Sequence, residues 1–247
     1  MSVAIPPVLI LAGGLGTRLN SINPGLPKSM VAVCGRPFIA HQLQLLKGQG
    51  VTKVVLCVGH NAQPLIDFVG DGKQFGLTVE YSCDDESQAL EPSAATLLGT
   101  GGALLKASRL VGSPFAVLYG DSWLEVEFAP IIEAFERLNK PALVTVYRNE
   151  NRYIPSNLKV EGQLVTAYNK EQPSADMVHV DFGLSIFSKQ AFAAFAAQRS
   201  FDLASLITSL IAARQLACYE VSQRFYEVGT PQALKELEEH LLERGLS

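Results

Sequence analysis

Short apolar segments alternate with amphipathic helical patterns along the first 150 residues, and this alternation limits the possible fold more than any other feature. The segments PVLILAG, KVVLCVG, LTVEYS and PFAVLYGD have the length and composition of buried strands. Helical patterns stand between them, as in PFIAHQLQLLKGQG, which glycine ends. Alternation of this kind predicts an α/β fold, with a Rossmann-like, mostly parallel sheet flanked by helices.

The pattern changes after residue 150. The segment NLKVEGQLVTAYN predicts a hairpin turning at Glu161 and Gly162, and MVHVDFGLSIFS predicts a long strand. Two helical stretches follow (189–198 and 203–215), then a strand-like segment (217–229) and a last helix from Pro231. The leucines of that helix, at 234, 237, 241 and 242, predict one packed stripe. We therefore expect a single domain over 1–247, with an α/β part (1–150) and an α+β part (151–247).

Composition and charge exclude several classes of function. A net charge of -4 gives no basic surface of the kind that nucleic acid or anionic lipid requires. The four cysteines are scattered, which argues against a zinc site or a disulfide framework. The N-terminal apolar run is too short and too broken by proline for a signal peptide or a membrane span, so we expect a cytoplasmic protein.

A glycine-rich turn, LAGGLGTRL, follows the first predicted strand. Glycines at a strand's carboxyl end let peptide N–H groups approach anionic oxygens closely. The turn matches neither the dinucleotide pattern nor the P-loop, and Arg18 and Lys28 follow it, which favours a polyphosphate ligand. The alternative is a purely structural turn with surface cations.

The motifs LAGGLGTRL and LPKSMVAVCGRPFIAHQL resemble those of the sugar-1-phosphate nucleotidyltransferases. The resemblance extends over nearly the whole chain and implies a GT-A-like nucleotidyltransferase fold whose C-terminal part binds the sugar. It also implies that Arg18 and Lys28 act on the phosphates as catalytic residues. The same resemblance gives nucleotide-binding roles to Leu11, Ala12, Gly13, Gly14, Gly16 and Thr17.

The segment LLGTGGALLKA resembles the second glycine-rich segment of this family, which meets the nucleoside base. The resemblance implies that Gly99, Thr100 and Gly101 contact the nucleotide through their backbone groups. A glycine-rich helix start with no ligand is the structural alternative.

Two carboxylates are candidates for a magnesium site. Asp121 follows an apolar strand in LYGDS and matches the family's metal-binding, catalytic aspartate, although an aspartate there can also cap a turn. Glu227 in FYEVGTPQAL stands where the family has aspartate. Either Glu227 binds the same Mg²⁺ from a retracted position, or Asp121 holds the ion with water and phosphate alone. A third possibility is that Glu227 only precedes the helix start near Thr230.

The sugar-phosphate side is implied by two further segments. Lys170 in VTAYNKEQPS matches the family's phosphate-binding lysine, and Asp181 and Gly183 in VHVDFGLSIFS stand at its asparagine and glycine. A carboxylate only accepts hydrogen bonds, so Asp181 predicts a sugar with a different hydroxyl pattern. Lys170 can alternatively be a surface charge at the end of a hairpin.

These features favour a Mg²⁺-dependent enzyme that makes an NDP-sugar and pyrophosphate from an NTP and a sugar 1-phosphate. By resemblance we expect guanylyl transfer to a heptose or mannose 1-phosphate, in a monomer or homodimer. The alternatives are a hexose or amino-sugar 1-phosphate uridylyl- or thymidylyltransferase and, more distantly, a non-catalytic nucleotide-sugar sensor. A dinucleotide-dependent oxidoreductase is disfavoured, because the second predicted strand ends in Gly59 and His60 rather than in an acidic residue.

Overall fold

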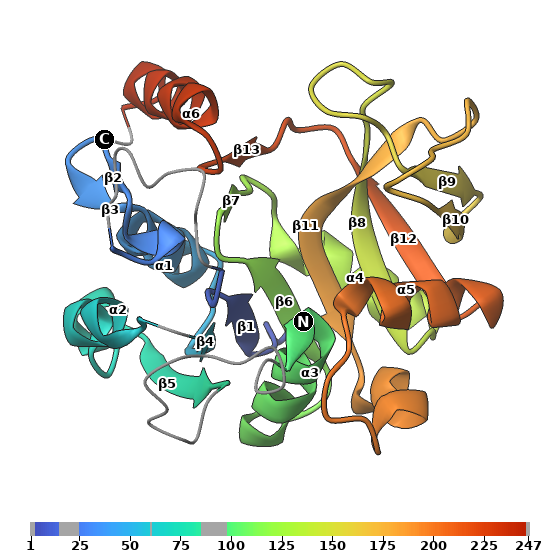
Figure 1. The fold of residues 1–247 in the computed structure, drawn as a ribbon, viewed down its shortest axis with the longest axis horizontal. Coiled ribbons are helices and arrows are strands. Elements are labelled where there is room, and N and C mark those ends of the chain that lie inside the picture. The colour runs from blue at the N-terminus through green and yellow to red at the C-terminus, as the bar shows by residue number, and fades with distance from the viewer. Residues whose placement is uncertain (1–2, 15–24, 60, 85–97, 246–247) are drawn as a thin grey trace.

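A computed structural model of the chain describes residues 3–14, 25–59, 61–84 and 98–245. Within these ranges the centre is one nine-stranded sheet of order β5-β4-β1-β6-β11-β8-β12-β10-β9 (Figure 1). Its strands are β1 (Val8–Leu11), β4 (Lys53–Val58), β5 (Thr78–Cys83), β6 (Phe115–Tyr119), β8 (Ala142–Arg148), β9 (Leu158–Glu161), β10 (Leu164–Tyr168), β11 (His179–Phe187) and β12 (Leu216–Val221).

The sheet is parallel in one half and mixed in the other. Strands β5, β4, β1 and β6 are parallel, as the strand and helix alternation predicts. Strand β11 runs antiparallel to both β6 and β8, and β12 returns parallel to β8. The hairpin of β9 and β10 turns where expected, with Gly162 at a φ of 62°. The fold is thus α/β, with its antiparallel pairs in the second half of the sheet.

Helices cover both faces of the sheet (Figure 1). One face packs against α1 (Phe38–Gly48), α2 (Gln63–Val69) and α4 (Phe128–Leu138). The other packs against α3 (Gly99–Ala107), α5 (Leu203–Ala212) and the 3-10 helix Lys189–Phe195. Side chains of β1 alternate between the two cores, with Val8 and Ile10 in one and Leu9 in the other. Three further 3-10 helices span Lys28–Met30, Lys73–Phe75 and Ser108–Leu110.

A third, smaller core lies beside the main sheet under the last helix, α6 (Pro231–Glu243). The side chain of Thr230 accepts the N–H of Ala233 at 3.1 Å, which caps the start of α6. The buried members of this core are Val31, Val33, Phe38, Trp123, Val228, Leu237 and Leu241. They join α6 to two short strand pairs, β2 (Ala32–Val33) with β3 (Arg36–Pro37), and β7 (Ser122–Trp123) with β13 (Tyr226–Glu227).

Three local expectations differ from the structure. Leu237 and Leu241 are fully buried, but Leu242 is 61% exposed, so its predicted place in the packed stripe is wrong. Segment 217–229 forms two strands instead of one, because β12 pairs in the main sheet and β13 pairs with β7. Segment 189–198 begins with a 3-10 helix, whose three residues per turn place Phe192 and Phe195, both buried, on the same side.

Among the described residues, no helix combines the length and the apolar character needed to cross a membrane.

Candidate active site

The carboxyl ends of three neighbouring strands meet at one edge of the sheet. Leu11 pairs in register with Cys57 of β4 and Tyr119 of β6, so the residues after each strand converge. The backbones approach closely there: a Cβ on Gly120 would lie 2.6 Å from the Leu11 carbonyl oxygen. A Cβ on Gly13 would lie 3.2 Å from the backbone nitrogen of Gly59. Glycine is needed at Gly120 for this packing alone, before any ligand is considered.

A cavity of about 290 Å³ opens at this edge. It brings together the described part of the glycine turn, the second glycine segment, Lys28 and Asp121. Its lining is Leu11, Ala12, Gly13, Gly14, Lys28, Ser29, Cys57, Asp84, Gly99, Thr100, Ala103, Tyr119, Gly120 and Asp121. We call it the first cavity.

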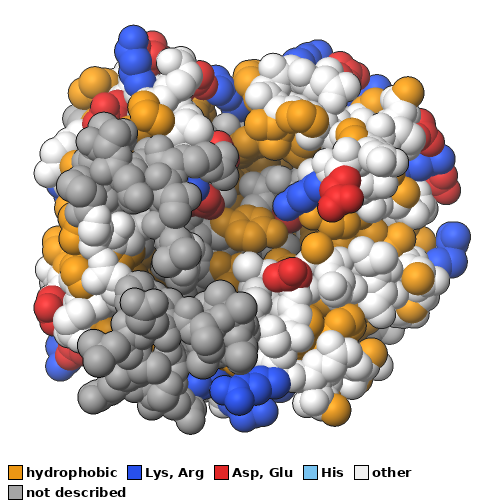
Figure 2. All heavy atoms as spheres, in the orientation of Figure 1, with side chains coloured by type: hydrophobic (Ala, Val, Ile, Leu, Met, Phe, Trp, Pro, Cys, Tyr) orange, Lys and Arg blue, Asp and Glu red, His pale blue; other side chains and the backbone are white. Residues whose placement is uncertain are grey.

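A second cavity of about 250 Å³ shares Thr100 and Tyr119 with the first. Its lining is Thr100, Tyr119, Val144, Leu158, Tyr168, Lys170, Asp181, Asp202, Leu203, Ala204, Ile207 and Leu216. Figure 2 shows this face hollowed near its centre, with hydrophobic side chains in the hollow and charged side chains at its rim. The two cavities therefore form adjoining compartments with a common wall.

Lys28 and Asp121 form an ion pair in the first cavity, with Lys28 Nζ 2.5 Å from Asp121 Oδ2. Their side chains are 17% and 32% exposed, so both are accessible to a ligand. Lys28 begins a short 3-10 helix, and Asp121 lies in the turn between β6 and β7. Residues 93 positions apart thus place opposite charges at one point.

Glu227 approaches the same point from the C-terminal part. Strand β13 pairs Glu227 with Ser122, directly after Asp121, and the Val228 N–H donates to the Asp121 carbonyl at 2.9 Å. A Cβ on Gly229 would lie 3.0 Å from Lys28 Nζ and 3.2 Å from Glu227 Oε1. Both charged groups therefore border the space beside Gly229.

Asp121 and Glu227 are the residues that could hold a divalent cation here. The described residues contain no group of three or more His, Cys, Asp or Glu side chains with metal-site geometry. Two carboxylates suit an ion that keeps several waters and takes its other ligands from phosphates, as Mg²⁺ does. A tightly enclosed site of protein ligands alone does not fit this arrangement.

Asp181 is held in place in the second cavity. Its Oδ1 accepts the Gly183 N–H at 2.9 Å, and its Oδ2 accepts the Tyr119 hydroxyl at 3.3 Å. Burial raises the pKa of Asp181, while the Gly183 N–H, Lys170 and Tyr119 act in the opposite direction. Burial, followed by the charge of Asp181, raises the pKa of Tyr119 well above its usual range, so its hydroxyl stays a donor.

The remaining predicted residues fall into two groups. Gly16, Thr17 and Arg18 lie outside the described residues. Gly101 and Gly183 are described, but neither belongs to the described lining of the two cavities. The Gly101 N–H donates to the Phe201 carbonyl at 3.0 Å rather than pointing to a free space. Gly183 has a φ of 105° and shapes the backbone that carries Asp181.

Sequence reasoning missed Tyr119, which borders both cavities. Its position directly before Gly120 and Asp121, at a strand's carboxyl end, is the signal that could have found it. It also missed Thr100's second role: Thr100 Oγ1 accepts the Leu203 N–H at 2.8 Å and so joins α3 to α5.

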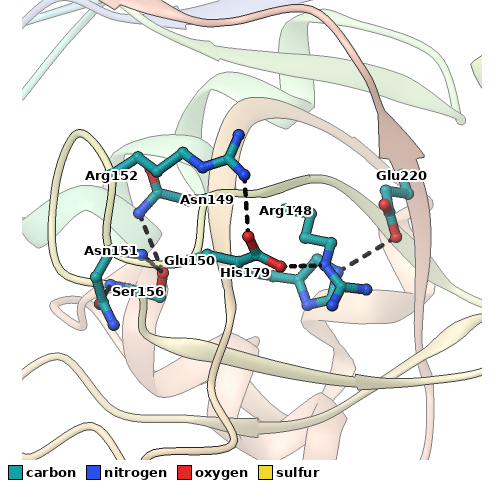
Figure 3. A network of polar contacts seen from close by, with 8 residues as sticks. All are labelled: Arg148, Asn149, Glu150, Asn151, Arg152, Ser156, His179 and Glu220. Carbon is teal, nitrogen blue, oxygen red and sulfur yellow. Dashed lines mark hydrogen bonds and ion pairs between the residues drawn. The ribbon is translucent and has the colours of Figure 1, made fainter.

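A structured loop, residues 149–156, lies between β8 and β9. Buried Asn149 donates to the Ile154 carbonyl at 2.6 Å and to Ser156 Oγ at 3.1 Å. Figure 3 shows Asn149 and Ser156 within this network. The loop presents Tyr153, whose ring lies 4.1 Å from the Arg224 guanidinium. Tyr153, Arg224 and Glu227 line a smaller cavity of about 200 Å³. The loop thus borders the same cavity as Glu227.

Parallel strands that end in a glycine turn, with facing cationic and carboxylate groups, define an α/β protein suited to a phosphorylated ligand. A family model described as nucleotidyl transferase matches residues 7–244. The chain therefore belongs to the nucleotidyl transferase family, an enzyme family whose members generally use a divalent metal ion.

Two curated relatives illustrate the range of similarity. The D-glycero-alpha-D-manno-heptose 1-phosphate guanylyltransferase of Campylobacter jejuni is 26% identical over 227 residues, 91% of this chain and 95% of that protein. A probable mannose-1-phosphate guanylyltransferase of Oryza sativa subsp. japonica is 37% identical over 143 residues. These residues make up 56% of this chain and 37% of the rice protein. The chain thus matches the heptose relative along nearly its whole length and the mannose relative only in part.

Solved structures agree with the fold. HddC from Yersinia pseudotuberculosis superimposes with a TM-score of 0.77 at 25% identity, covering 96% of this chain and 100% of that one. A putative glucose-1-phosphate thymidylyltransferase from Bacillus anthracis gives a TM-score of 0.78 at 19% identity, covering 96% and 95%. These neighbours have the GT-A-like nucleotidyltransferase fold, which confirms the fold expected from the sequence.

Proposed function

We propose that this enzyme transfers a guanylyl group from GTP to a heptose or mannose 1-phosphate, giving a GDP-sugar and pyrophosphate. The observation that carries the proposal is the pair of adjoining cavities, which share Thr100 and Tyr119. One is lined by a glycine turn, a lysine and an aspartate, and the other by Lys170 and Asp181. A reaction that joins two phosphorylated substrates needs two such compartments.

In the proposed reaction an oxygen of the sugar phosphate attacks the α-phosphorus of the triphosphate. The bond from that phosphorus to the bridging oxygen breaks, and pyrophosphate leaves with the bonding electron pair. The nucleophile is already an anion, so neither a covalent enzyme intermediate nor a protein base is required. Catalysis then consists of positioning the two substrates and neutralising their negative charge.

The first cavity supplies the groups for the nucleotide. We assign phosphate contacts to the backbone from Leu11 to Gly14, and charge neutralisation to Lys28. The close approach of β1, β4 and β6 supports this assignment, because it places the backbone of Gly13 and Gly14 at the cavity edge. Gly16, Thr17 and Arg18 complete the proposed phosphate contacts, and Gly99 and Thr100, which line the first cavity, the proposed base contacts. Gly101 is left out of the proposed base contacts, because its N–H donates to the Phe201 carbonyl.

We propose that the metal ion is Mg²⁺ and that Asp121 and Glu227 hold it. Lys28 Nζ pairs with Asp121 and lies, like Glu227 Oε1, beside Gly229, which supports a shared ion over one held by Asp121 alone. When bound, the ion supplies positive charge to the phosphate oxygens.

The second cavity supplies the groups for the sugar phosphate. We assign the phosphate to Lys170 and the sugar hydroxyls to Asp181, whose oxygens are oriented by Gly183 and Tyr119. Gly183 also lies close to the catalytic turn, since a Cβ there would be 3.4 Å from Ser122 Oγ. This proximity supports a sugar phosphate bound beside Asp121.

The first test is pyrophosphate release from four NTPs, each combined with a panel of sugar 1-phosphates, with and without Mg²⁺. We expect release to require GTP, a heptose or mannose 1-phosphate, and Mg²⁺ together. Release with UTP or dTTP and a hexose or amino-sugar 1-phosphate would contradict the guanylyl assignment. Tight NDP-sugar binding without any release would indicate a sensor instead of an enzyme.

The charged pair gives a matched mutational test. We expect Lys28→Met and Asp121→Asn each to lower kcat about 100- to 1000-fold, because each removes charge stabilisation from the transition state. Lys73 and Asp71 form a similar ion pair at 2.6 Å on the exposed surface, so Lys73→Met and Asp71→Asn serve as controls. Asp121→Asn with full Mg²⁺-dependent activity would contradict the metal assignment.

We also propose that the chain works as one domain in the cytoplasm, where nucleoside triphosphates are made, as a monomer or homodimer. Sharing of the main sheet by both parts of the chain supports the single domain. Cell fractionation and light scattering test the location and the oligomeric state.

A further inference from the structure

Gln42 is a buried polar residue of α1 whose buried neighbours on the helix are mostly apolar. Its exposed fraction is 2%, and Phe38, Ile39, Leu43 and Leu46 of the same helix are fully buried. Burying an amide in such surroundings costs free energy unless its hydrogen bonds are made, whereas leucine or methionine would fill the space at no such cost. The hydrogen bonds of the Gln42 side chain therefore indicate why an amide is buried at this position.

The Gln42 amide uses both of its N–H donors on one turn. Nε2 donates to the Tyr119 carbonyl at 2.9 Å and to the Ser122 carbonyl at 2.8 Å. These two carbonyls stand on either side of Gly120 and Asp121. One planar group thus spans the turn that carries the proposed catalytic carboxylate, and it fixes the distance between the two ends of that turn.

Two backbone hydrogen bonds complete the fixation of this turn. The Gly120 N–H donates to the Leu11 carbonyl at 3.0 Å, and the Asp121 carbonyl accepts the Val228 N–H at 2.9 Å. The first ties the turn to the glycine-turn strand and the second ties it to the segment of Glu227. Gln42, on α1, supplies the third attachment of the turn through its two side-chain hydrogen bonds.

The oxygen of the same amide has no hydrogen-bond partner among the described residues, although it is buried. An amide whose acceptor is left unmet and whose two donors are both used is retained for its donors. Both donors bond carbonyls of the Asp121 turn, so the buried amide stabilises the conformation of this turn.

We propose that Gln42 is a positioning residue that holds the Asp121 carboxylate in the geometry needed for metal binding and transfer. This inference rests on the proposed function of Asp121. Gln42 itself is buried behind the turn, so it acts through Asp121 and not on the substrate.

The test compares Gln42→Met with Gln49→Met. Gln49 ends the same helix, and its Oε1 accepts the Phe128 N–H at 3.1 Å, at the start of α4. Both variants lose a side-chain contact to the backbone of another element, but only Gln42 reaches the Asp121 turn. Gln42→Asn is a second variant, which stays polar but is too short to span both carbonyls. Urea unfolding establishes that each variant is folded.

Steady-state kinetics and Mn²⁺ binding, followed by electron paramagnetic resonance, give the readouts. For both Gln42 variants we expect kcat to fall about 10- to 100-fold, and the Kd for Mn²⁺ to rise about tenfold. The KM values should change less than about threefold, because misplacing Asp121 weakens the transition state more than substrate binding. Gln49→Met should leave kcat and Mn²⁺ affinity close to wild type.

Two results would overturn the inference: a kcat loss no larger than that of Gln49→Met, or unchanged Mn²⁺ affinity in folded Gln42 variants. Failure of the proposed function looks different, because wild type itself would then release no pyrophosphate from any substrate pair. In that case amide hydrogen exchange decides: faster exchange at residues 120–123 in Gln42→Met supports the positioning role, and unchanged exchange rejects it.

Discussion

Tyr119 borders both of the cavities that we propose for the two substrates. Its ring lies in the wall between the two cavities, and its hydroxyl donates to Asp181. Neither fact is visible in the sequence, because the pairing of β6 with β11 brings Tyr119 to a residue 62 positions away. The sequence could indicate Gly120 and Asp121 as a strand-end motif, but it could not indicate the partner of the preceding residue.

Tyr119→Phe removes only this hydroxyl. We expect the KM for the sugar 1-phosphate to rise about five- to tenfold, the equivalent of one hydrogen bond worth about 1 kcal/mol. The KM for the nucleotide should stay unchanged, because the ring remains in the shared wall. Tyr219→Phe, outside the described lining of both cavities, is the control. An equal rise in both KM values would show that Tyr119 does not act through Asp181.

His41 couples the stability of the fold to pH. Burial lowers the pKa of His41 below its usual value of 6.5, with its hydrogen bond to the Val33 carbonyl acting in the opposite direction. The folded protein therefore takes up this proton less readily than the unfolded chain does. Protonation of the unfolded chain removes stability as the pH falls through about 6.5.

The measurement is urea unfolding of wild type and His41→Gln between about pH 8 and about pH 5. Glutamine can keep a donor toward Val33 but does not titrate, so the difference between the two proteins isolates His41. We expect wild type to lose stability relative to the variant as the pH falls. If the difference in free energy of unfolding between the two proteins stays constant across this pH range, the pKa of His41 is not lowered in the folded state.

At the scale of elements, sequence patterns located most strands and helices but could not explain all their glycines. Gly99, Gly101 and Gly102 were assigned to a ligand or to a helix start, yet all three pack against segment 199–202. A Cβ on Gly101 would lie 2.3 Å from the Phe201 ring, and one on Gly99 would lie 2.6 Å from the Phe201 carbonyl oxygen. Such close packing depends on a distant segment, so local pattern reasoning had no access to it.

The leucines of α6 offer a test at this scale. Leu241 is fully buried in the small core, and its neighbour Leu242 is 61% exposed. We expect Leu241→Ala to lower the free energy of unfolding by about 2–5 kcal/mol, because it leaves a cavity in this core. Leu242→Ala should change it by less than about 0.5 kcal/mol. Equal effects measured by urea unfolding would show that the two side chains have similar surroundings.

At the scale of the whole molecule, the two parts predicted from the sequence, 1–150 and 151–247, share one sheet. Strand β8 belongs to residues 1–150 but lies between β11 and β12 of the second half. Strand alternation predicted the parallel half because neighbouring strands there are joined by helices. It could not predict this insertion, since the order of strands in a mixed sheet depends on pairings far apart in the chain.

This shared sheet predicts one cooperative unfolding transition. Trp123, the sole tryptophan, reports on the small core, and far-ultraviolet circular dichroism reports on the sheet and helices. We expect the two signals to change together during urea unfolding, because neither half can lose its strands without exposing the other. Two separated transitions would show that the small core or one half unfolds independently.

The position of α6 has a consequence for the synthesis of the protein. The Cys34 N–H donates to Glu238 Oε1 across 204 residues, and Leu237 and Leu241 pack in the core that also holds Val33, Trp123 and Val228. Lys28 and Asp121 therefore leave the ribosome long before the segment that completes their surroundings. A growing chain carries the glycine turn early, but the surroundings of Lys28 and Asp121 are assembled only after β13 and α6 have been added.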